Sequence, residues 1–529
     1  MIKTAGYNPL MSLRDYFVGH RGISKNEAAR ILARVVELGF DFKSRKQFYH
    51  RKQGKPPRQV VEEGLPTTPT AIDDVLDSLA ADYLPGMPNF ASPHFLGFPD
   101  AGNSIAGLSG AVLSDFLNVN MINSTFCSRV AAEMEISVIN WFREIIGYDA
   151  AQPFSEYEEQ DSIDNVGGMV LYGGTMSNYA AALLARERAF PGTKKTGVRF
   201  DTSKVKVVVP EGIKHYTVAA SLAWCGLGSE NMIEAPIRGY RYDQRALSRL
   251  FRAARENGER IIMLVAYAGD SRTMTIEDLT GLHDLVRGES PDTWLHCDGC
   301  HGTSLAFSEK LRHHLQGIEL YDSVTVDPHK VLAVPYPLSL FLVARPEVLR
   351  VIDTESDLIM RQGRSLGRRT PVVGSKAFIA CRLWMLMKMH GVSGIAELVE
   401  QRCDMAQTFA EMIRKDERFL LINDVMFNSV TFVYVPRKFR GDGMTLSQAE
   451  ELSVLNRRIY EQVMAEGKYY IHSFVIADDL NRIGCGRDFS VNVLRFMSGN
   501  PLISEAVLVD FLGYLSVIAD ECSSGQRLP

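Results

Sequence analysis

The sequence lacks three features that would place it in a membrane or outside the cell. It has no apolar run of the roughly 20 residues needed to cross a bilayer. Its first residues, Met1–Tyr7, contain no apolar signal core, so we expect no export. Eight cysteines among 529 residues are too few for a disulfide framework and favour free thiols. Together these absences predict a cytoplasmic protein with no membrane partner.

An excess of positive charge is also missing. The formal net charge is −5, which argues against nucleic acid as the main partner. An anionic ligand must therefore be held by local donors. The HExxH motif of metalloproteases is absent, as is any Ser-His-Asp signature of a hydrolase. The hydrophobic content of 46% is that of an ordinary globular protein, and the length predicts two or three domains.

Short apolar segments alternate with helical periodicity in the middle of the chain. The clearest helix is Asp243–Asn257, which has an aspartate as N-cap and Gly258 as its stop. Such alternation predicts an α/β fold with a mostly parallel central sheet and helices on both faces. Ligands in these sheets bind beyond the carboxyl ends of the strands. The predicted strands are Met169–Leu171, Val205–Val209, Ile261–Ala266, Thr293–Cys297, Ser323–Val326 and Ser339–Val343.

Two further parts flank this region. Residues 1–103 contain two predicted helices, Asn26–Leu38 and Ala71–Tyr83, and an ordered aromatic loop, Phe90–Pro99. The large domain is predicted over residues 104–390, beginning with a helical stretch and ending with a helix through Trp384. Residues 391–529 mix helices and strands, which predicts a small C-terminal α+β domain. The remaining predicted elements are Ser104–Tyr148, Gly394–Lys415, Ser429–Val435, Ser447–Glu466 and Val491–Met497.

The stretch Ser323–Lys330 organises the rest of the chain. Its β-branched residues predict a short strand, which an aspartate–proline pair ends abruptly. His329 and Lys330 follow, and then the apolar run Val331–Val334, which offers no charge to the Lys330 ammonium. We therefore expect a desolvated amine with a lowered pKa, as a Schiff-base lysine requires. A lysine at a strand end is more often a surface residue, so the neighbouring motifs must decide whether Lys330 is catalytic.

Gly173–Asn178 follows a predicted strand and opens a helix. Its two glycines let the backbone approach a ligand closely, while the hydroxyls of Thr175 and Ser177 and the helix N-terminus offer donors to an anion. The segment lacks the lysine of a P-loop and the spacing of the dinucleotide fingerprint, so a phosphate monoester is the better match. The same turn also occurs in proteins without any ligand.

The segment His296–His301 contains two cysteines and two histidines. Its CxxCH pattern matches c-type haem attachment, and its composition suggests zinc. Haem attachment belongs to exported proteins, and no second Cys or His pair follows at ligand spacing, so we predict no metal. Strand alternation places Cys297 on the face opposite His296 and Asp298. A carboxylate such as Asp298 at a buried strand end pairs with a cation, for example a protonated ring nitrogen, or caps a turn.

Two further residues are candidates for chemistry. His215 lies at a strand-to-helix junction on the same carboxyl edge as Thr175, Asp298 and Lys330. Arg495 interrupts an apolar strand near the C-terminus. An arginine in that position either extends to solvent or clamps a carboxylate with two hydrogen bonds.

At these residues the sequence resembles the pyridoxal-phosphate-dependent decarboxylase family that includes glutamate, cysteine sulfinate and aromatic-L-amino-acid decarboxylases. The resemblance runs from about Ala71 to Ala519, and its most specific motif is Asp327–Lys330. It implies the fold-type I architecture, pyridoxal 5′-phosphate as cofactor and an amino acid as substrate. It also implies a homodimer with sites at the subunit interface, with the N-terminal segment packing on the partner.

The resemblance implies a role for each matching residue. Lys330 would hold the cofactor covalently, Asp298 would keep its pyridine nitrogen protonated, and His215 would stack on its ring. His329 matches the histidine beside the lysine. Further cofactor contacts are predicted at Thr175, Met176, Ser177 and Cys300, and substrate contacts at Arg495, Phe98 and His94.

The chain departs from the family at three places, one of which is the turn Ala268–Arg272, where the family has a threonine-rich sequence. Cys300 stands where the family has an alanine beneath the cofactor ring. The family's mobile loop carries a tyrosine that returns a proton to the substrate, whereas residues 351–373 of this chain contain no aromatic residue. The remaining candidates for that proton are His215, His329, Tyr336, Tyr469 and Tyr470.

We therefore predict an L-amino-acid decarboxylase that releases an amine and carbon dioxide. The apolar side chain of Phe98 favours an uncharged substrate, so an aliphatic or sulfur-containing side chain is preferred to an acidic or aromatic one. The C-terminal third nevertheless looks more like the acidic-amino-acid branch. One alternative is decarboxylation coupled to oxidative deamination, which gives an aldehyde. A transaminase is a second alternative, which His329-Lys330 disfavours. A scaffold protein without cofactor is a third, and the presence of Lys330, Asp298 and His215 counts against it.

Overall fold

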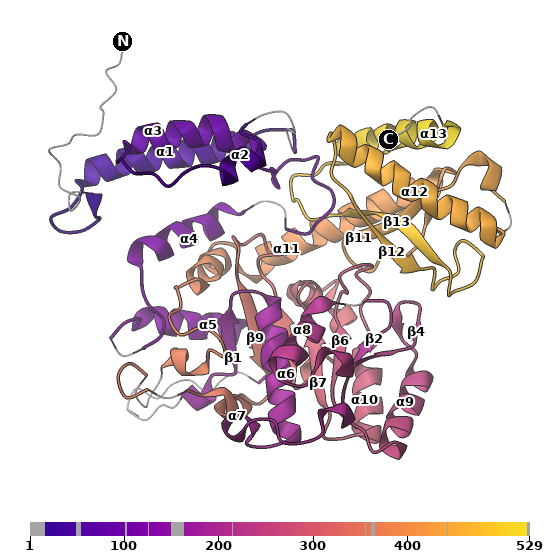
Figure 1. Ribbon diagram of the computed structural model, residues 1–529, viewed down its shortest axis with the longest axis horizontal. Helices are drawn as coiled ribbons and strands as arrows, with labels where there is room; N and C mark the ends of the chain where they lie inside the picture. Colours follow the sequence, from indigo (N-terminus) through magenta and orange to yellow (C-terminus); the bar gives the residue numbers. More distant parts are fainter. Residues whose placement is uncertain are drawn as a thin grey trace, which may run out of the picture.

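The computed structural model describes residues 16–48, 54–100, 103–124, 126–149, 163–213, 215–354, 356–360, 365–441 and 443–525. The segment Met1–Tyr7 lies outside these ranges, as do residues 355 and 361–364 of the loop discussed above. Figure 1 shows an α/β domain, a smaller domain that contains the C-terminus, and a separate layer of N-terminal helices.

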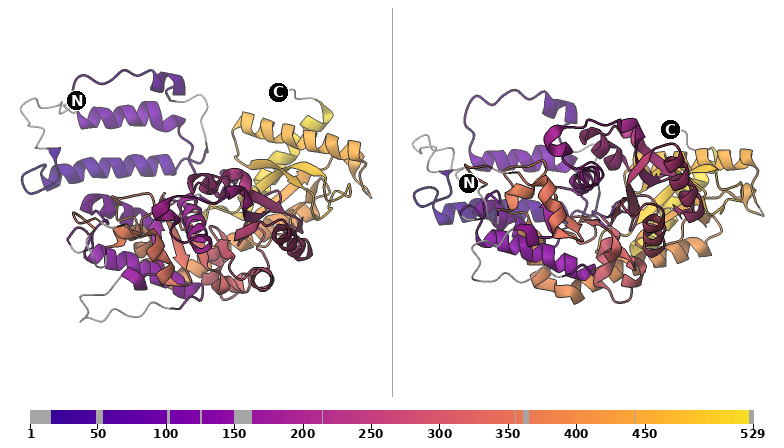
Figure 2. Two further views of the ribbon diagram at one scale, coloured as in Figure 1. Left: turned by 60° about the horizontal axis from the view of Figure 1, so that its bottom comes forward. Right: turned by 90° about the horizontal axis from the view of Figure 1, so that it is seen from below.

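The N-terminal layer contains both helices predicted there. Helix α1 begins after Ser24, whose hydroxyl accepts from the amide of Glu27 at 3.2 Å. Arg30 joins it to α3 through two 3.0 Å hydrogen bonds to Asp73. Figure 2 shows the layer beside the α/β domain in both views. Its helices are α1 (Lys25–Lys43), α2 (Pro57–Val61) and α3 (Ile72–Ser78), and α3 continues into short turns at Leu79–Tyr83 and Leu84–Gly86.

The α/β domain is built on a seven-stranded sheet in the order β1-β9-β8-β7-β6-β2-β3. Strand β9 runs antiparallel to both of its neighbours, and the other pairs are parallel. The carboxyl ends of the six remaining strands therefore lie at one edge. The strands are β1 (Gly168–Leu171), β2 (Val205–Pro210), β3 (Met232–Ala235), β6 (Arg260–Tyr267), β7 (Trp294–Asp298), β8 (Ser323–Val326) and β9 (Ser339–Val343), and a small ladder joins β4 (Ile237–Arg238) to β5 (Arg241–Tyr242).

Helices cover both faces of this sheet, because alternate strand residues enter two separate cores. Val207 and Val209 of β2 pack with α6 and α8, whereas Val208 packs in the core that contains α5, α9, α10 and the first half of α11. The predicted fold class, an α/β fold with a mostly parallel central sheet and helices on both faces, is confirmed. The helices are α4 (Ile105–Leu117), α5 (Val130–Ile145), α6 (Gly174–Ala189), α7 (Thr193–Thr196), α8 (Tyr216–Trp224), α9 (Gln244–Glu256), α10 (Leu279–Glu289) and α11 (Ala380–Lys415).

The small domain is a four-stranded antiparallel sheet, in the order β10-β11-β13-β12, packed against helices. Phe409 of α11, Ile459 of α12 and Phe511 of α13 share its core with the strands. Its elements are β10 (Phe419–Leu421), β11 (Ser429–Tyr434), α12 (Leu446–Glu466), β12 (His472–Ala477), β13 (Ser490–Met497) and α13 (Glu505–Ser524).

One predicted helical segment differs from the structure. The stretch Ser104–Tyr148 is two helices rather than one, since Asn118 ends α4 with a left-handed φ of 48°. The two helices expected on either side of residue 390 both form: α11 is interrupted at Gly391, whose φ of 60° and ψ of −174° are not helical, and its second part runs on to Lys415. The domain boundary placed at 390/391 stays a prediction.

Three further properties concern the environment and possible ligands. No helix within the described ranges is both long enough and apolar enough to cross a membrane. All eight cysteines are free. In the part of the chain that the structure describes, no group of three His, Cys, Asp or Glu side chains could hold a metal ion.

Candidate active site

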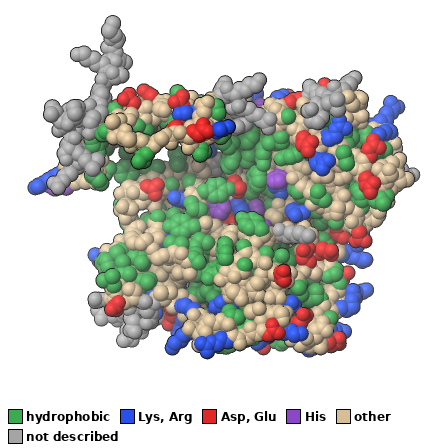
Figure 3. Space-filling model, viewed as in Figure 1, with side chains coloured by type: hydrophobic (Ala, Val, Ile, Leu, Met, Phe, Trp, Pro, Cys, Tyr) green, Lys and Arg blue, Asp and Glu red, His purple; other side chains and the backbone are tan. Residues whose placement is uncertain are grey.

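Four predicted site segments meet at the carboxyl edge of the sheet. The N-terminus of α6 follows β1, His215 follows β2, Asp298 ends β7, and Asp327–Lys330 follows β8. These strands are neighbours or near neighbours in one sheet, so the fold brings together residues that are more than 150 positions apart in sequence. Figure 3 shows a hollow between the two domains in which histidine and cationic side chains gather.

Lys330 is more tightly paired than the sequence predicted. Its Nζ lies 3.0 Å from Oδ2 of Asp327, a buried carboxylate only three residues earlier in the chain. Burial alone would lower the pKa of Lys330, but the acidic groups of Cys300, Asp327 and Asp298 outweigh it and hold the pKa above its ordinary value. The predicted lowering of this pKa is therefore wrong for the cofactor-free protein, because sequence reasoning treated Asp327 only as the end of a strand.

His329 lies beside this ion pair. Its Nδ1 is 2.5 Å from the carbonyl oxygen of Leu338, and its Nε2 is 3.8 Å from Oδ2 of Asp327. The His329 ring also packs against Tyr336, with 4.7 Å between the ring centroids. The residue is buried, so these contacts hold the imidazole in one orientation next to Lys330.

Asp298 is buried and has well-defined partners. Nδ2 of Asn178 donates to its Oδ2 at 3.1 Å, and the backbone N–H of Cys300 donates to its Oδ1 at 3.3 Å. Burial favours the neutral acid, but the charges of His215 and Lys330 outweigh it and hold the pKa of Asp298 below its ordinary value. The carboxylate therefore stays ionised, as a partner for a protonated pyridine nitrogen requires.

A chain of buried polar side chains behind Asp298 holds it in place, and sequence reasoning missed this chain. Oδ1 of Asn178 lies 3.0 Å from Nε2 of His296, whose Nδ1 is 2.8 Å from Oγ of Ser323. Burial lowers the pKa of His296 to about 4, so this imidazole is neutral. The only sequence signals were a polar residue, Asn178, near the start of α6 and a histidine on an apolar strand.

His215 precedes α8 at the same edge of the sheet. Its Nδ1 makes a short hydrogen bond to Oγ1 of Thr217, which also accepts from Nδ2 of Asn178 at 2.9 Å. Burial lowers the pKa of His215, although the Asp298 carboxylate partly opposes this shift. A neutral imidazole with one fixed nitrogen can stack on a planar ring.

The N-terminus of α6 fits a phosphate group. Gly173 has a φ of 131°, which strongly favours glycine, and no side chain caps the helix. Oγ of Ser177 is buried and has no hydrogen-bond partner among the described residues. Thr175 and Met176 are half-buried in the same turn. Free amides at the end of a 16-residue helix, together with an unpaired buried hydroxyl, suit an anion.

Cys300 lies where α6 approaches the strand ends. A Cβ on Gly174 would lie 2.8 Å from Sγ of Cys300 and 2.9 Å from Oδ2 of Asp327, so only glycine fits at that position. Burial and the charges of Asp298 and Asp327 raise the pKa of the Cys300 thiol well above its ordinary value. Cys300 is therefore a neutral, packed thiol.

The predicted substrate residues Phe98 and Arg495 come together, but His94 does not join them. The guanidinium carbon of Arg495 lies 6.0 Å from the centroid of the Phe98 ring. Nη1 of Arg495 donates to the carbonyl of Ser271 at 2.7 Å and Nη2 to that of Gly97 at 3.1 Å, while Nε has no partner in the described structure. These carbonyl bonds leave Arg495 fewer free donors than a dedicated carboxylate clamp would have.

His94 lies on the other side of this loop. Its ring packs on Tyr469 at 4.4 Å, and it makes no described contact with the strand-end residues. Tyr469 in turn hydrogen-bonds to Asp510 of α13. The prediction of His94 as a substrate contact therefore gains no support from the structure, because the loop turns between His94 and Phe98.

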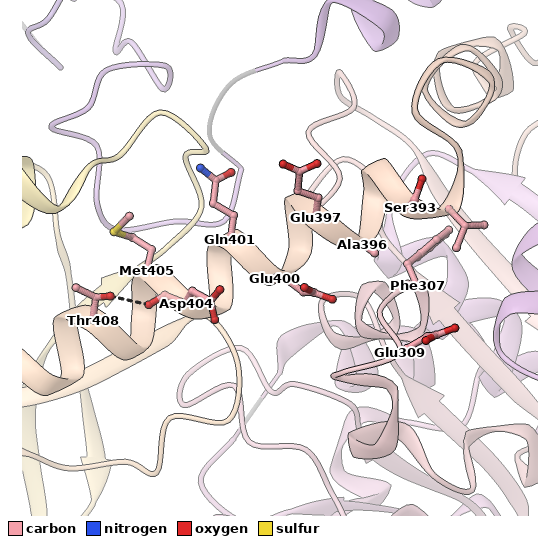
Figure 4. A pocket seen from close by; sticks show the side chains of 11 residues that line it. Phe307, Glu309, Ser393, Ala396, Glu397, Glu400, Gln401, Asp404, Met405 and Thr408 are labelled. Carbon is pink, nitrogen blue, oxygen red and sulfur yellow. Dashed lines mark hydrogen bonds between the residues drawn. The ribbon is translucent and has the colours of Figure 1, made fainter.

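A second hollow, of about 910 Å³, lies along α11 away from these residues (Figure 4). None of the predicted site residues lines it. Its carboxylates are already partly engaged, since Ser308 donates to Glu400 and Lys310 lies 3.2 Å from Asp404. The residues that line it are Phe307, Glu309, Val392, Ser393, Ala396, Glu397, Glu400, Gln401, Asp404, Met405 and Thr408.

Comparison with known proteins gives consistent matches. The family model described as "Pyridoxal-dependent decarboxylase conserved domain" matches residues 55–435. The aromatic-L-amino-acid decarboxylase of Bacillus atrophaeus is 22% identical over 483 residues, which cover 88% of this chain and 89% of the relative. Tryptophan decarboxylase 2 of Oryza sativa subsp. japonica is 24% identical over 485 residues, which cover 89% of this chain and 90% of the relative. Phenylacetaldehyde synthase of Petunia hybrida is 24% identical over 483 residues, which cover 86% of this chain and 88% of the relative.

Solved structures show the same fold. The crystal structure of Oryza sativa TDC with PLP and tryptamine superposes with a TM-score of 0.81 at 20% identity, covering 95% of this chain and 99% of that one. That of mouse CSAD in apo form gives a TM-score of 0.79 at 21% identity, covering 94% and 99%.

The lysine at a parallel strand end, the ionised buried aspartate and the uncapped α6 are parts of a pyridoxal-phosphate enzyme. The match over residues 55–435 is more specific. The chain belongs to the pyridoxal-dependent decarboxylase family and is a pyridoxal-phosphate-dependent amino-acid decarboxylase.

Proposed function

We propose that this enzyme decarboxylates an aromatic L-amino acid to the corresponding amine. The main support for an aromatic substrate is a group of aromatic side chains beside Arg495. Phe98 and His472 lie edge to face at 5.0 Å, His472 and Phe474 at 6.0 Å, and the Arg495 guanidinium is 5.3 Å from the Phe474 ring. Phe98, His472 and Phe474 are all half-buried, so each keeps surface for a ligand. Curated relatives that act on aromatic amino acids support this choice over the aliphatic or sulfur-containing side chain predicted from Phe98 alone.

His472 adds a polar group to these aromatic side chains. It stands directly opposite Arg495 in the antiparallel pair of β12 and β13, so both side chains lie on one face of the sheet. Burial and the charge of Arg495 lower the pKa of His472, so the imidazole is neutral. Its Nδ1 lies 3.0 Å from the carbonyl oxygen of Ser473, to which it donates, and this leaves Nε2 as an acceptor. An acceptor among aromatic rings suits a phenol O–H or an indole N–H.

The other residues of the site take the roles that their positions support. Pyridoxal phosphate, when bound, supplies a ring that accepts the electron pair released with carbon dioxide. Lys330 holds the cofactor aldehyde, and Asp298 faces the ring nitrogen. The amides at the N-terminus of α6 and Oγ of Ser177 bind the phosphate. Nε of Arg495 has a free donor for the substrate carboxylate.

The fixed partners described above keep most of these groups in place before any substrate arrives. Asp298, His215 and His329 each have hydrogen bonds that set their orientation, and pre-organised groups of this kind lower the barrier to reaction.

A second candidate is the aldehyde-forming variant of the same reaction. It is favoured by the absence of any aromatic residue between 351 and 373, since a slowly protonated product is open to oxygen. One relative is named phenylacetaldehyde synthase.

The proposal includes a homodimer in a reducing, cytoplasmic environment. Helix α4 exposes Ile105, Val112, Phe116 and Leu117, each between 45% and 56% exposed, and such an apolar stripe suits a second copy of the chain. The eight free cysteines agree with a reducing compartment. Sedimentation velocity of the wild type and of Phe116→Glu, with exposed Val454→Glu as control, tests the dimer.

The substrate is tested with a panel of the twenty amino acids and cysteine sulfinate, scored separately for carbon dioxide, amine, aldehyde and peroxide. We expect carbon dioxide and amine from tyrosine or tryptophan in preference to phenylalanine. Release only from glutamate, aspartate or cysteine sulfinate would contradict the aromatic assignment, and stoichiometric peroxide would favour the second candidate.

A further inference from the structure

The segment that follows Lys330 presents a tyrosine to the site from a firmly held turn. Arg382 of α11 donates from Nη1 to the carbonyl of Tyr336 at 2.6 Å and to that of Pro335 at 3.2 Å. The amide of Ser104 donates to the carbonyl of Ala333 at 3.0 Å. Two separate helices therefore fix this turn, and the position of Tyr336 is set by the fold.

The Tyr336 side chain lies between the site and solvent. Its ring lies against that of His329, the neighbour of Lys330, with 4.7 Å between the centroids and a tilt of 42° between the ring planes. The residue is 48% exposed, so its other side is open to water. A phenol held next to the covalent lysine position and also in contact with solvent is suited to carrying a proton between them.

A carboxylate from a distant part of the chain meets this phenol. Asp100, at the end of the aromatic loop, hydrogen-bonds through its side chain to Tyr336. Its Oδ1 is buried and has no partner within the described ranges. The other charged groups that act on Asp100 are Lys330, His329 and Asp327 at the site, and it acts in turn on the buried Arg402 and Arg495.

Both groups of this pair favour their protonated forms. Burial raises the pKa of Asp100, although Tyr336 and Lys330 partly oppose the shift. Burial and the Asp100 carboxylate raise the pKa of Tyr336. A group whose pKa is raised gives up its proton most readily to a strong base, such as the carbon left behind when carbon dioxide departs.

We propose that Tyr336 is the catalytic acid that protonates the substrate Cα after decarboxylation, and that Asp100 positions Tyr336 and restores its proton. This inference rests on the proposed decarboxylase function and deepens it. Tyr336 lies outside residues 351–373. Its phenol pairs with the carboxyl group of Asp100, which comes from another loop of the same chain.

The proton balance of the step is simple. Cleavage of the bond between Cα and the carboxylate leaves its electron pair on the substrate, and the amine forms when Cα gains one proton. The Tyr336 O–H bond breaks as the Cα–H bond forms. The resulting phenolate takes the proton of the Asp100 carboxyl group, and Asp100 regains a proton from the water that reaches Tyr336. No oxidant or reductant is consumed.

The test compares Tyr336→Phe with the wild type and with Tyr460→Phe, a half-buried tyrosine of α12 in the small domain. The first readout is exchange of the Cα hydrogens of the product amine in D₂O, followed by NMR, which reports protonation of Cα without decarboxylation. We expect Tyr336→Phe to slow this exchange at least about 100-fold, the scale of general acid catalysis. The dissociation constant of the amine should stay within about threefold of the wild type.

The second readout is the product ratio under air. Tyr336→Phe should still release carbon dioxide, but the share of aldehyde, with equal peroxide and ammonia from reaction with dioxygen, should rise at least about tenfold. Exchange within twofold of the wild type, or a wild type that itself forms stoichiometric aldehyde, would overturn the assignment. If the wild type releases no carbon dioxide from any aromatic amino acid, the proposed substrate class fails instead, and the exchange test is run with the amine that the panel identifies.

Asp100 is tested without cofactor or turnover. Infrared difference spectra of the cofactor-free protein near pH 5, where an ordinary aspartate is ionised, should show a protonated-carboxyl band that Asp100→Asn lacks. In the holoenzyme the same variant should shift the pH profile of hydrogen exchange and leave the amine dissociation constant unchanged. Identical spectra and identical pH profiles would remove Asp100 from the role, even if Tyr336→Phe proved unstable.

Discussion

Asn178 donates a hydrogen bond from Nδ2 to Oδ2 of Asp298 at 3.1 Å, across two elements that are 120 residues apart in the chain. The contact links the N-terminal part of α6, whose first turn binds the phosphate in the proposed site, to the end of β7, which faces the ring nitrogen there. One amide thereby ties together the two ends of the cofactor site.

Asn178→Ala should weaken cofactor binding about 10- to 100-fold. The change leaves Asp298 and His296 each short of one buried hydrogen bond, at about 1–3 kcal/mol. Titration of the cofactor-free protein, followed by visible absorbance, measures the dissociation constant. Asn492→Ala, in the small domain, is the matched control. Equal affinities for Asn178→Ala and the wild type would mean that the bridge does not support Asp298.

Asp298→Asn should retain the covalently bound cofactor but lower kcat by several orders of magnitude. A neutral amide cannot keep the pyridine nitrogen protonated, so the ring becomes a poor electron acceptor. Steady-state kinetics with the best substrate of the panel, alongside the absorption spectrum, separates loss of rate from loss of cofactor. A near-normal kcat with the cofactor fully bound would assign protonation of the ring to another group.

Lys330→Ala should abolish the adduct that borohydride reduction forms between cofactor and protein. The amine is buried beside Asp327 at the strand end, and the described structure places no other lysine among the strand-end site residues. Mass spectrometry of the reduced protein detects the adduct, and exposed Lys310→Ala is the control. A reduced pyridoxyl group on any other lysine of the variant would move the site elsewhere.

His472→Phe should change selectivity more than overall rate. The variant keeps an aromatic ring opposite Arg495 but removes the acceptor Nε2, so kcat/KM for tyrosine or tryptophan should fall about tenfold relative to phenylalanine. His94→Phe, on the far side of the loop, should leave the ratio unchanged. Equal losses for all three substrates would indicate that His472 only supports the sheet.

Glu277→Gln should make the protein more stable than the wild type, by an amount that increases with pH. Burial raises the pKa of Glu277 to about 8, against a hydrogen bond from Tyr242 N–H and the charge of Arg241, and its Oε1 has no partner in the described structure. The folded state therefore keeps a proton that the unfolded state releases near pH 4.5. Stability from this group is complete below that pH and is lost as pH rises through about 8.

The glutamine variant has no such proton to lose. Its melting temperature should exceed that of the wild type by an amount that grows from pH 5 to pH 8.5. The difference corresponds to up to about 5 kcal/mol, because the pKa of Glu277 rises from 4.5 to about 8 on folding and each pH unit between them costs about 1.4 kcal/mol. Thermal unfolding at several pH values measures the difference. A difference in melting temperature that stays constant across this pH range would mean that Glu277 does not titrate with a raised pKa.

The sequence by itself determined the local elements and the residues with the most specific chemistry. Strands β8 and β9 have the predicted bounds, because their apolar and β-branched residues are followed at once by a chain-breaking pair or a polar turn. The order of a phosphate-binding turn, His215, Asp298 and Lys330 along an alternating α/β pattern was enough to predict one edge of one sheet. Local propensity and strand alternation are properties of neighbouring residues, so they can be read from the chain.

Only the tertiary structure decided which groups face one another. The placement of His472 opposite Arg495 and the meeting of Asp100 with Tyr336 depend on strand register and on loops from different parts of the chain. The ion pair of Lys330 with Asp327 is local in sequence, but it forms because the fold buries the Asp327 carboxylate at the strand end. The same loop places Phe98 beside Arg495 and His94 against Tyr469. These relationships arise from long-range packing, which no local sequence pattern records, and they set the charge and the protonation of the residues that the sequence had already named.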